Sequence, residues 1–314
     1  MSKVHVLGSM NMDLVARVEQ FPRPGETLFG HDFQILPGGK GLNQAVAAAR
    51  AGASVVMRGA VGADAHGTSL RDFLAQEGVD IQGVSTASSV ATGTALILVD
   101  GKGENSIVVV PGANHQIPQT VAAPQPVHGD FLLAPFEVPD LAIEPAFAHA
   151  RAVGASTVLN PAPARPCRPA ILEQTDLLVV NETELQFFAD RSGADRGQGE
   201  AREAQGETVT RERIVSWVER LAVGHRMGVV ATLGGRGLIA SLRGRLIELP
   251  APEVAVVDTT AAGDTFVGAL AAGMAGGTSV EESLQFAIAA AGICVSRAGA
   301  APSIPELREI RGIL

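Results

Sequence analysis

The sequence predicts an α/β fold with a mainly parallel sheet, to which a small second sheet is attached. Short apolar runs such as residues 4–7 and 177–180 end in Gly or Asn, as buried parallel strands do when functional residues follow them. Longer segments with helical spacing separate these runs, which is the alternation of βαβ units. Weakly alternating segments broken by Pro and Gly within residues 13–36 interrupt this order and predict a small β excursion.

The composition favours a small-molecule partner. The chain has 314 residues, of which 46% are hydrophobic, enough for a buried core. A formal net charge of −9 without a basic stripe argues against a nucleic-acid or membrane partner. Cys167 and Cys294 lie far apart, without other ligands at metal spacing, so neither a disulfide framework nor a zinc site is expected. Residues 1–8 enter a strand directly, and no apolar run is long enough for a bilayer, so we expect a cytoplasmic protein.

In the first part of the chain, Pro and Gly residues separate three expected antiparallel strands, at residues 14–18, 26–29 and 32–35. Residues 55–60 then predict a strand, and residues 68–78 an amphipathic helix. Residues 94–99 and 107–110, joined through a Gly-containing turn, predict a hairpin that pairs with the first β excursion.

The α/β alternation resumes after residue 123. Strands are expected at residues 130–134, 156–159, 177–180, 228–231 and 238–241, and helices at residues 138–153, 211–223, 279–296 and 305–314. Residues 190–210 are charged, rich in Gly and nearly free of large apolar side chains, so they predict a mobile surface loop.

The most informative stretch is residues 257–266, Val-Asp-Thr-Thr-Ala-Ala-Gly-Asp-Thr-Phe. Residues 253–257 predict a strand and residues 263–276 a helix, so the stretch lies at a helix N-terminus. The unpaired N–H groups of a first helical turn bind anions, and the small residues before Asp264 keep the approach open. Asp264 adds a carboxylate that can take a proton from an attacking hydroxyl, which indicates phosphoryl transfer to an alcohol. The simpler interpretation is that Asp264 only caps the helix.

Polar residues after the first strand also have two interpretations. Asn11 and Asp13 are either turn residues or ligand contacts. The run Gly38-Gly39-Lys40-Gly41 lacks the spacing of a nucleotide P-loop, so its glycines mark either a turn or a close approach of the backbone to a ligand. In the second case Lys40 and Asn43 would add polar contacts.

Two later segments point to a nucleotide. Glu182 and Glu184 begin a helix, where carboxylates usually act as caps, but beside a phosphate site they would hold Mg²⁺ through water. The glycines within residues 232–237 form either a hairpin turn or a surface that a nucleotide approaches closely.

Five ordered motifs together resemble the ribokinase-like (PfkB) family of carbohydrate kinases. They are Gly8-Ser9-Met10-Asn11-Met12-Asp13, Gly38-Gly39-Lys40-Gly41-Leu42-Asn43-Gln44-Ala45, Asn181-Glu182-Thr183-Glu184, Thr232-Leu233-Gly234-Gly235-Arg236-Gly237 and Asp258-Thr259-Thr260-Ala261-Ala262-Gly263-Asp264-Thr265-Phe266. Any single motif is weak, but five in the family's order from end to end are specific. Residues 21–27, 160–164 and 299–303 further resemble the branch of the family that phosphorylates ribose.

The resemblance implies a three-layer sandwich with a mainly parallel central sheet, formed by residues 1–12, 37–93 and 112–314. It also implies a β-sheet lid of residues 13–36 and 94–111. The implied reaction transfers a phosphoryl group from ATP to the O5 hydroxyl of D-ribose. Mg²⁺ would be required, K⁺ would activate, and a homodimer would form through the lids.

The resemblance further implies a role for each matching residue. The sugar contacts would be Asn11, Asp13, Gly39, Lys40, Asn43, Glu137 and Asp264, with Asp264 as the general base and the backbone of Ala261, Ala262 and Gly263 as the anion hole. The ATP contacts would be Asn181, Thr232, Gly234, Gly235, Arg236, Gly237, Gly263 and Ile288, the last in place of a polar residue beside the adenine. Glu184 would order Mg²⁺ through water, and the K⁺ site would include Asp258, Thr260, Cys294, Arg297, Gly299 and Ser303.

The sequence leaves two alternatives open. Another kinase of the family, acting on deoxyribose, a ketose or a nucleoside, would carry the same motifs, and the size of the sugar pocket would decide between them. A catalytically silent sugar-binding regulator is the alternative from a different class. It is disfavoured because Asp264, Glu184 and the small residues of the anion hole are all present.

Overall fold

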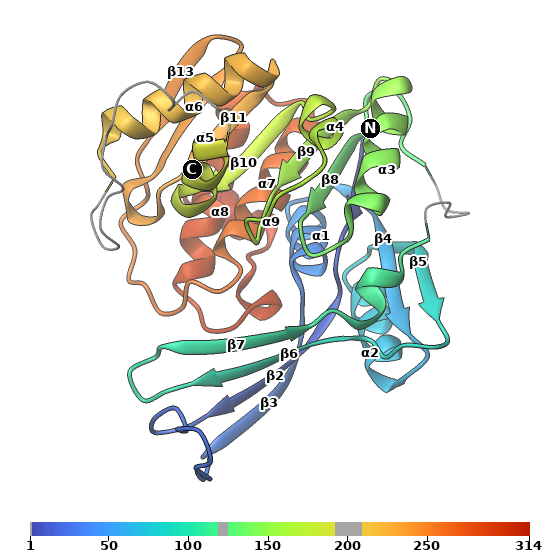
Figure 1. Ribbon diagram of the computed structural model, residues 1–314. Coiled ribbons are helices and arrows are strands. Elements are labelled where there is room, and N and C mark those ends of the chain that lie inside the picture. The colour runs from blue at the N-terminus through green and yellow to red at the C-terminus, as the bar shows by residue number, and fades with distance from the viewer. Residues whose placement is uncertain (1, 119–124, 192–208) are drawn as a thin grey trace.

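The large sheet is mainly parallel, as predicted. The computed structural model describes residues 2–118, 125–191 and 209–314 (Figure 1). Within these ranges the sheet has nine strands, in the order β13 (Arg245–Leu249), β12 (Leu238–Leu242), β11 (Gly228–Thr232), β10 (Leu177–Asn181), β9 (Ser156–Asn160), β8 (Phe131–Pro135), β1 (Lys3–Leu7), β4 (Ser54–Gly62) and β5 (Asp80–Ala87). Neighbouring strands are parallel except at β11–β12 and β12–β13. Most of the surface loop predicted for residues 190–210 lies outside the described residues.

Helices cover both faces of this sheet, which confirms the expected three layers (Figure 1). One buried apolar cluster includes residues of α1 (Lys40–Arg50), α2 (Ala65–Gln76), α7 (Ala262–Ala275), α8 (Val280–Val295) and α9 (Leu307–Arg311). A second cluster includes residues of α3 (Asp140–Ala152), α4 (Pro169–Glu173), α5 (Glu182–Arg191) and α6 (Arg211–His225). In the described ranges, no helix combines the length and hydropathy needed to cross a membrane.

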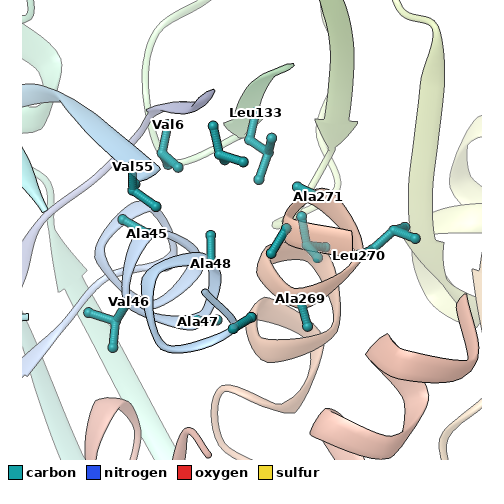
Figure 2. Packing of buried hydrophobic residues seen from close by; sticks show 14 of the residues in the cluster. Val6, Ala45, Val46, Ala47, Ala48, Val55, Leu133, Ala269, Leu270 and Ala271 are labelled. Carbon is teal, nitrogen blue, oxygen red and sulfur yellow. The ribbon is translucent and has the colours of Figure 1, made fainter. Parts of the chain in front are cut away.

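Helices α1 and α7 pack closely because small residues line their contact. Ala47 and Ala48 on α1 face Ala269 and neighbouring residues of α7, with side chains of β1, β4 and β8 beside them (Figure 2). A Cβ atom added at Gly268 would lie 2.5 Å from the carbonyl oxygen of Gln44. This approach brings the first turn of α1 next to the first turn of α7.

A separate four-stranded sheet projects from one end of the large sheet, in the part of the chain that the structure describes (Figure 1). Its order is β3 (Asp32–Gly38), β2 (Asn11–Arg17), β6 (Gly93–Val99) and β7 (Asn105–Val110). The β2–β3 and β6–β7 pairs are antiparallel, whereas β2 and β6 run parallel. The predicted hairpin and its pairing with the first β excursion are therefore confirmed, and we refer to this sheet as the lid. Short 3₁₀ helices η1 (Gly112–Gln116), η2 (Gly234–Arg236) and η3 (Ala301–Ser303) complete the described structure.

Two predicted strands are wrong. At residues 26–29, Glu26 instead closes a local turn, because its backbone N–H bonds to the carbonyl of Arg23 and its carboxylate accepts from the N–H of Arg23. Residues 253–257 are also irregular and largely exposed. The N–H of Val257 donates to the carbonyl of Val295 at the end of α8, and so no neighbouring strand pairs with it.

The α1–α7 contact leads to a stability prediction. Gly268→Ala should destabilise the fold by about 1–3 kcal/mol, because the new methyl group meets backbone atoms of α1 that cannot turn aside. Gly224→Ala on α6 is the matched control, since a methyl group there meets open space and should stabilise by about 0.4–1 kcal/mol. Urea unfolding of the two variants measures both changes. A Gly268→Ala protein as stable as the wild type would show that the helices can separate without cost.

Candidate active site

The N-terminus of α7 has the backbone geometry of an anion site. Ala261, the residue before the helix, has the left-handed values φ 60° and ψ 5°, and no side chain caps the first turn. A left-handed alanine costs about 1 kcal/mol or more, so surrounding contacts must hold it in place. At Gly263 an added Cβ atom would meet open space. The first-turn N–H groups of α7 are therefore accessible to a phosphate, and the helix begins at Ala262, one residue before the predicted start at Gly263.

Asp264, in the first turn of α7, is buried and held by two amide groups from α1. The Nδ2 of Asn43 donates to Oδ2 of Asp264 at 3.1 Å, and the Nε2 of Gln44 donates to Oδ1 at 3.0 Å. An ionised carboxylate only accepts hydrogen bonds, so two N–H donors suit it. Its remaining lone pairs stay available for a substrate hydroxyl.

A cavity of about 330 Å³ lies beside this carboxylate. Its lining comes from α1, the lid, β9, β10, α5, β11 and the start of α7, and comprises Lys40, Asn105, Ile107, Asn160, Ala162, Val179, Val180, Asn181, Glu184, Thr232, Thr259, Thr260, Ala261, Gly263, Asp264 and Val267. The negative charge of Asp264 raises the pKa of Lys40 against the opposing effect of burial, and Glu137 and Glu184 add to the rise. Lys40 therefore remains a cation in the cavity, where it can bind phosphate oxygens.

The expected sugar residues gather at the base of the lid. Asp13 on β2 is buried, and burial raises the pKa of its carboxyl to about 7, with the charges of Glu137 and Asp264 adding to the rise. The carboxylate of Glu137 accepts from the hydroxyl of Ser9 at 2.5 Å and from the N–H of Lys40 at 3.0 Å. A Cβ atom added at Gly39 would lie 2.8 Å from the backbone nitrogen of Asn11. The fold thus brings three carboxylates close enough for their charges to interact.

Asn114 also belongs to this group of polar residues, and sequence reasoning missed it. Its Nδ2 donates to Oδ1 of Asn11 at 2.7 Å, and its Oδ1 accepts from the N–H of Met10 at 2.9 Å. Because the oxygen of Asn11 is already engaged, its Nδ2 is the group left to face a ligand. The only sequence signal was that this Asn closely follows the Pro111-Gly112 pair after β7. Ser9, Gln44 and Asn160 were also present in the motifs, but no site role was expected for them.

At the other end of the cavity, Glu184 and Asn181 cap α5 reciprocally. The backbone N–H of Asn181 donates to Oε2 of Glu184 at 2.9 Å, its Nδ2 donates to Oε1 at 3.1 Å, and its Oδ1 accepts from the N–H of Glu184 at 2.9 Å. Burial raises the pKa of Glu184, against the N–H bond from Asn181 and the charge of Lys40. The described residues contain no cluster of His, Cys, Asp or Glu that would enclose a metal ion. A single carboxylate fits Mg²⁺ bound mainly by water and phosphate, as this ion prefers.

The expected nucleotide segment follows β11. A Cβ atom added at Gly234 or Gly235 would meet open space. Gly237, with φ 91°, instead lies against the carbonyl of Leu249, in the turn between β11 and β12. The guanidinium of Arg236 pairs with the carboxylate of Glu182. Thr232 lines the cavity. Ile288 on α8 is half-buried, packs against the core and is not part of the cavity lining.

The residues expected to bind K⁺ lie in the segment before α7 and at the end of α8 with the segment that follows it, and hydrogen bonds connect these segments. Oδ1 of Asp258 accepts from the N–H of Thr260 at 2.9 Å and from its hydroxyl at 2.6 Å, and Oδ2 accepts from the N–H of Gly299 at 2.9 Å. Burial opposes ionisation of Asp258, but these bonds outweigh it and lower its pKa.

Other members of this cluster differ in what they offer a cation. The Sγ of Cys294 lies 3.7 Å from the carbonyl oxygen of Thr260 and 3.1 Å from the hydroxyl of Ser303. The guanidinium of Arg297 pairs with Glu309 at 2.6 Å, which leaves only its backbone oxygen for the site. Carbonyl oxygens and one carboxylate are donors that suit K⁺.

Comparisons with known proteins agree with this architecture. The chain matches the pfkB family carbohydrate kinases over residues 1–307. It is 38% identical over 310 residues to the ribokinase of Haemophilus influenzae, covering 97% of this chain and 95% of that protein. It is 36% identical to the ribokinase of Schizosaccharomyces pombe, covering 99% and 98%. A structure of Arabidopsis thaliana ribokinase complexed with ribose and ATP aligns with a TM-score of 0.86 at 31% identity, covering 100% and 99%.

The family resemblance that the five motifs predicted is therefore confirmed. The match extends over nearly the whole chain, the fold agrees, and a carboxylate lies beside an open helix N-terminus. The chain belongs to the pfkB family of carbohydrate kinases, enzymes that transfer a phosphoryl group to a sugar.

Proposed function

We propose that this kinase transfers the γ-phosphoryl group of ATP to the O5 hydroxyl of D-ribose. The observation that carries this proposal is the buried carboxylate of Asp264, which two amides orient beside the uncapped N-terminus of α7. Whole-length similarity to ribokinases supports ribose as the sugar. The buried carboxylate of Asp13 on β2 supports recognition of neighbouring hydroxyl groups.

The reaction follows from the roles of these groups. Ionised Asp13 accepts hydrogen bonds from two sugar hydroxyls and directs the exocyclic hydroxyl toward Asp264. Asp264 takes the proton of that hydroxyl while its oxygen forms a bond to the γ-phosphorus, and the bond from phosphorus to the β-γ bridging oxygen breaks, releasing ADP. The N–H groups at the start of α7 and the ammonium of Lys40 stabilise the charge on the transferred group.

Two ions complete this proposal. Mg²⁺ bound with ATP would neutralise charge on the phosphates. Glu184 would hold its water shell, with Asn181 keeping both carboxylate oxygens in place. K⁺ would lie at the cluster that includes Asp258 and Thr260, directly before Ala261. That position supports a role in holding the loop whose left-handed residue opens the anion site.

We further propose that two copies of the chain associate through the outer faces of their lids. Strand register places Leu14, Ile35, Leu96 and Val108 on one face, opposite to the face that carries Asp13. On that outer face the side chains of Phe33, Ile35, Leu96, Val108 and Val110 remain between 48% and 59% exposed. An apolar face that spans all four strands of a sheet favours a self-complementary partner over water.

Substrate turnover tests the reaction. With Mg-ATP and KCl, the wild-type protein should release ADP with D-ribose at least about tenfold faster than with 2-deoxy-D-ribose, because a missing hydroxyl leaves Asp13 a buried unpaired acceptor. Asp264→Asn should lower kcat by about 10²- to 10⁴-fold, since the amide cannot take the proton. Phosphorylation of fructose or adenosine without ribose turnover would refute the choice of sugar. An Asp264→Asn enzyme with near-normal kcat would remove the general base.

Ribose binding should depend on pH through Asp13. Its pKa of about 7 means that the free carboxyl is largely protonated at about pH 6, whereas ribose hydroxyls donate to the ionised form. Ribose binding should therefore release protons, and the affinity should fall by about tenfold per pH unit below that pKa and level off above it. Calorimetric titrations in buffers of different ionisation enthalpy measure the released protons. Asp13→Asn should abolish the release, and a wild-type affinity that is constant from about pH 5.5 to 8 would contradict the assignment.

Sedimentation of the purified protein tests the dimer. The wild-type chain should sediment as a dimer at about micromolar concentration, and Val108→Lys should convert it to a monomer by placing a charge in an apolar interface. Val223→Lys is the matched control, because Val223 is 79% exposed and belongs to α6, a helix that lies far from the lid (Figure 1), and this variant should remain a dimer. A monomeric wild-type chain, or dimers of Val108→Lys, would exclude the lid interface.

A further inference from the structure

Gln44 has no assigned role, yet it is fully buried and contacts the proposed base directly. Its Nε2 donates to Oδ1 of Asp264 at 3.0 Å and to Oδ1 of Asn160 at 3.0 Å. We propose that Gln44 is a positioning residue for Asp264, which fixes the carboxylate and keeps one N–H donor on its Oδ1 oxygen. This role rests on the proposed kinase function, in which Asp264 is the general base.

The direction of these hydrogen bonds is determined by the backbone. The Nδ2 of Asn160 donates at 3.0 Å to the carbonyl oxygen of Val179 on β10, and a carbonyl can only accept. Asn160 must therefore turn its oxygen toward Gln44, which in turn must present its NH₂ group. A flipped Gln44 amide would place its oxygen against two other acceptors. The orientation thus passes from a strand of the sheet through Asn160 and Gln44 to the carboxylate of Asp264.

The opposite end of the Gln44 amide supports a role in the site rather than in stability. Within the described residues its Oε1 is buried and has no hydrogen-bond partner. Leaving a buried carbonyl unpaired destabilises a fold, and an apolar side chain of similar size would avoid this cost. The NH₂ group of Gln44 is therefore the functional part of the side chain, and it donates to Asp264 and Asn160.

Gln44 also differs from Asn43, the other amide on the base. Asn43 is expected to contact the sugar and donates to Oδ2 of Asp264. Gln44 is 0% exposed and does not line the cavity, so it cannot touch either substrate and acts only through Asp264. Its loss should therefore change the chemical step and leave sugar binding nearly unchanged.

Gln44→Leu tests this role, because leucine has a similar size but no donor. We expect kcat with ribose to fall by about 10- to 100-fold, as when a charge-assisted hydrogen bond is lost, while KM for ribose changes by less than about threefold. The acid limb of the pH profile of kcat should move to higher pH, because the ionised carboxylate loses one of its donors. Asn160→Leu, which removes the group that orients Gln44, should move the same limb in the same direction.

Gln174→Leu is the matched control, because the Oε1 of Gln174 is also buried without a hydrogen-bond partner among the described residues. Gln174 follows α4 and precedes β10, at the end of that strand opposite to Asn181, so the change removes no group near Asp264, kcat should stay within about twofold and the acid limb should not move. If Gln44→Leu retains wild-type kcat, or loses activity without a shift of the acid limb in it or in Asn160→Leu, the positioning role is wrong. A wild-type protein that does not phosphorylate ribose would overturn the proposed function itself, which separates the two failures.

Discussion

The close packing of α1 against α7 is the contact on which the site depends. Small residues on both helices, with Gly268 at the nearest point, allow the first turn of α1 to reach the first turn of α7. Only at this separation do the short amides of Asn43 and Gln44 reach the carboxylate of Asp264. The same helix pair forms part of the largest apolar cluster, so the packing that stabilises the fold also sets the geometry of the proposed base.

Most of the fold could be predicted from patterns along the chain. Buried parallel strands leave short apolar runs, and helices leave longer periodic segments, so the α/β alternation and the lid hairpin were readable. Strand β5 was missed because it lies at the edge of the sheet and has no apolar run. The strand predicted at residues 253–257 was wrong although that segment has an apolar run. Three valines in that segment have strand-like character, but they lie on the surface, and the N–H of Val257 bonds to the end of α8.

The candidate site was predictable where a motif names the residue, and hidden where the contact is three-dimensional. Asp264, Lys40 and Asp13 stand in motifs with chemical meaning, and the fold brings them close enough for the charge of Asp264 to act on the other two. Asn114 was missed because its value lies in a bond to Asn11 across 103 positions of the chain. Gln44 likewise stands in one of the motifs, but its contact with Asp264 spans 220 positions of the chain. No local pattern reports such a pairing, since it exists only once distant elements of the chain have packed together.

Both strand pairs of the lid, β2–β3 and β6–β7, join the rest of the molecule at the same end of the sheet. Strands β2 and β6 begin at this end, at Asn11 and Gly93, and strands β3 and β7 finish at the same end, at Gly38 and Val110. The residues proposed to bind the sugar gather at that end. Asn105, at the far end of the same sheet, lines the cavity beside the start of α7. Because Asn105 lies at the opposite end of β7 from Val110, a rotation of the sheet about the end at Asn11 would displace the cavity lining more than the residues near Asn11.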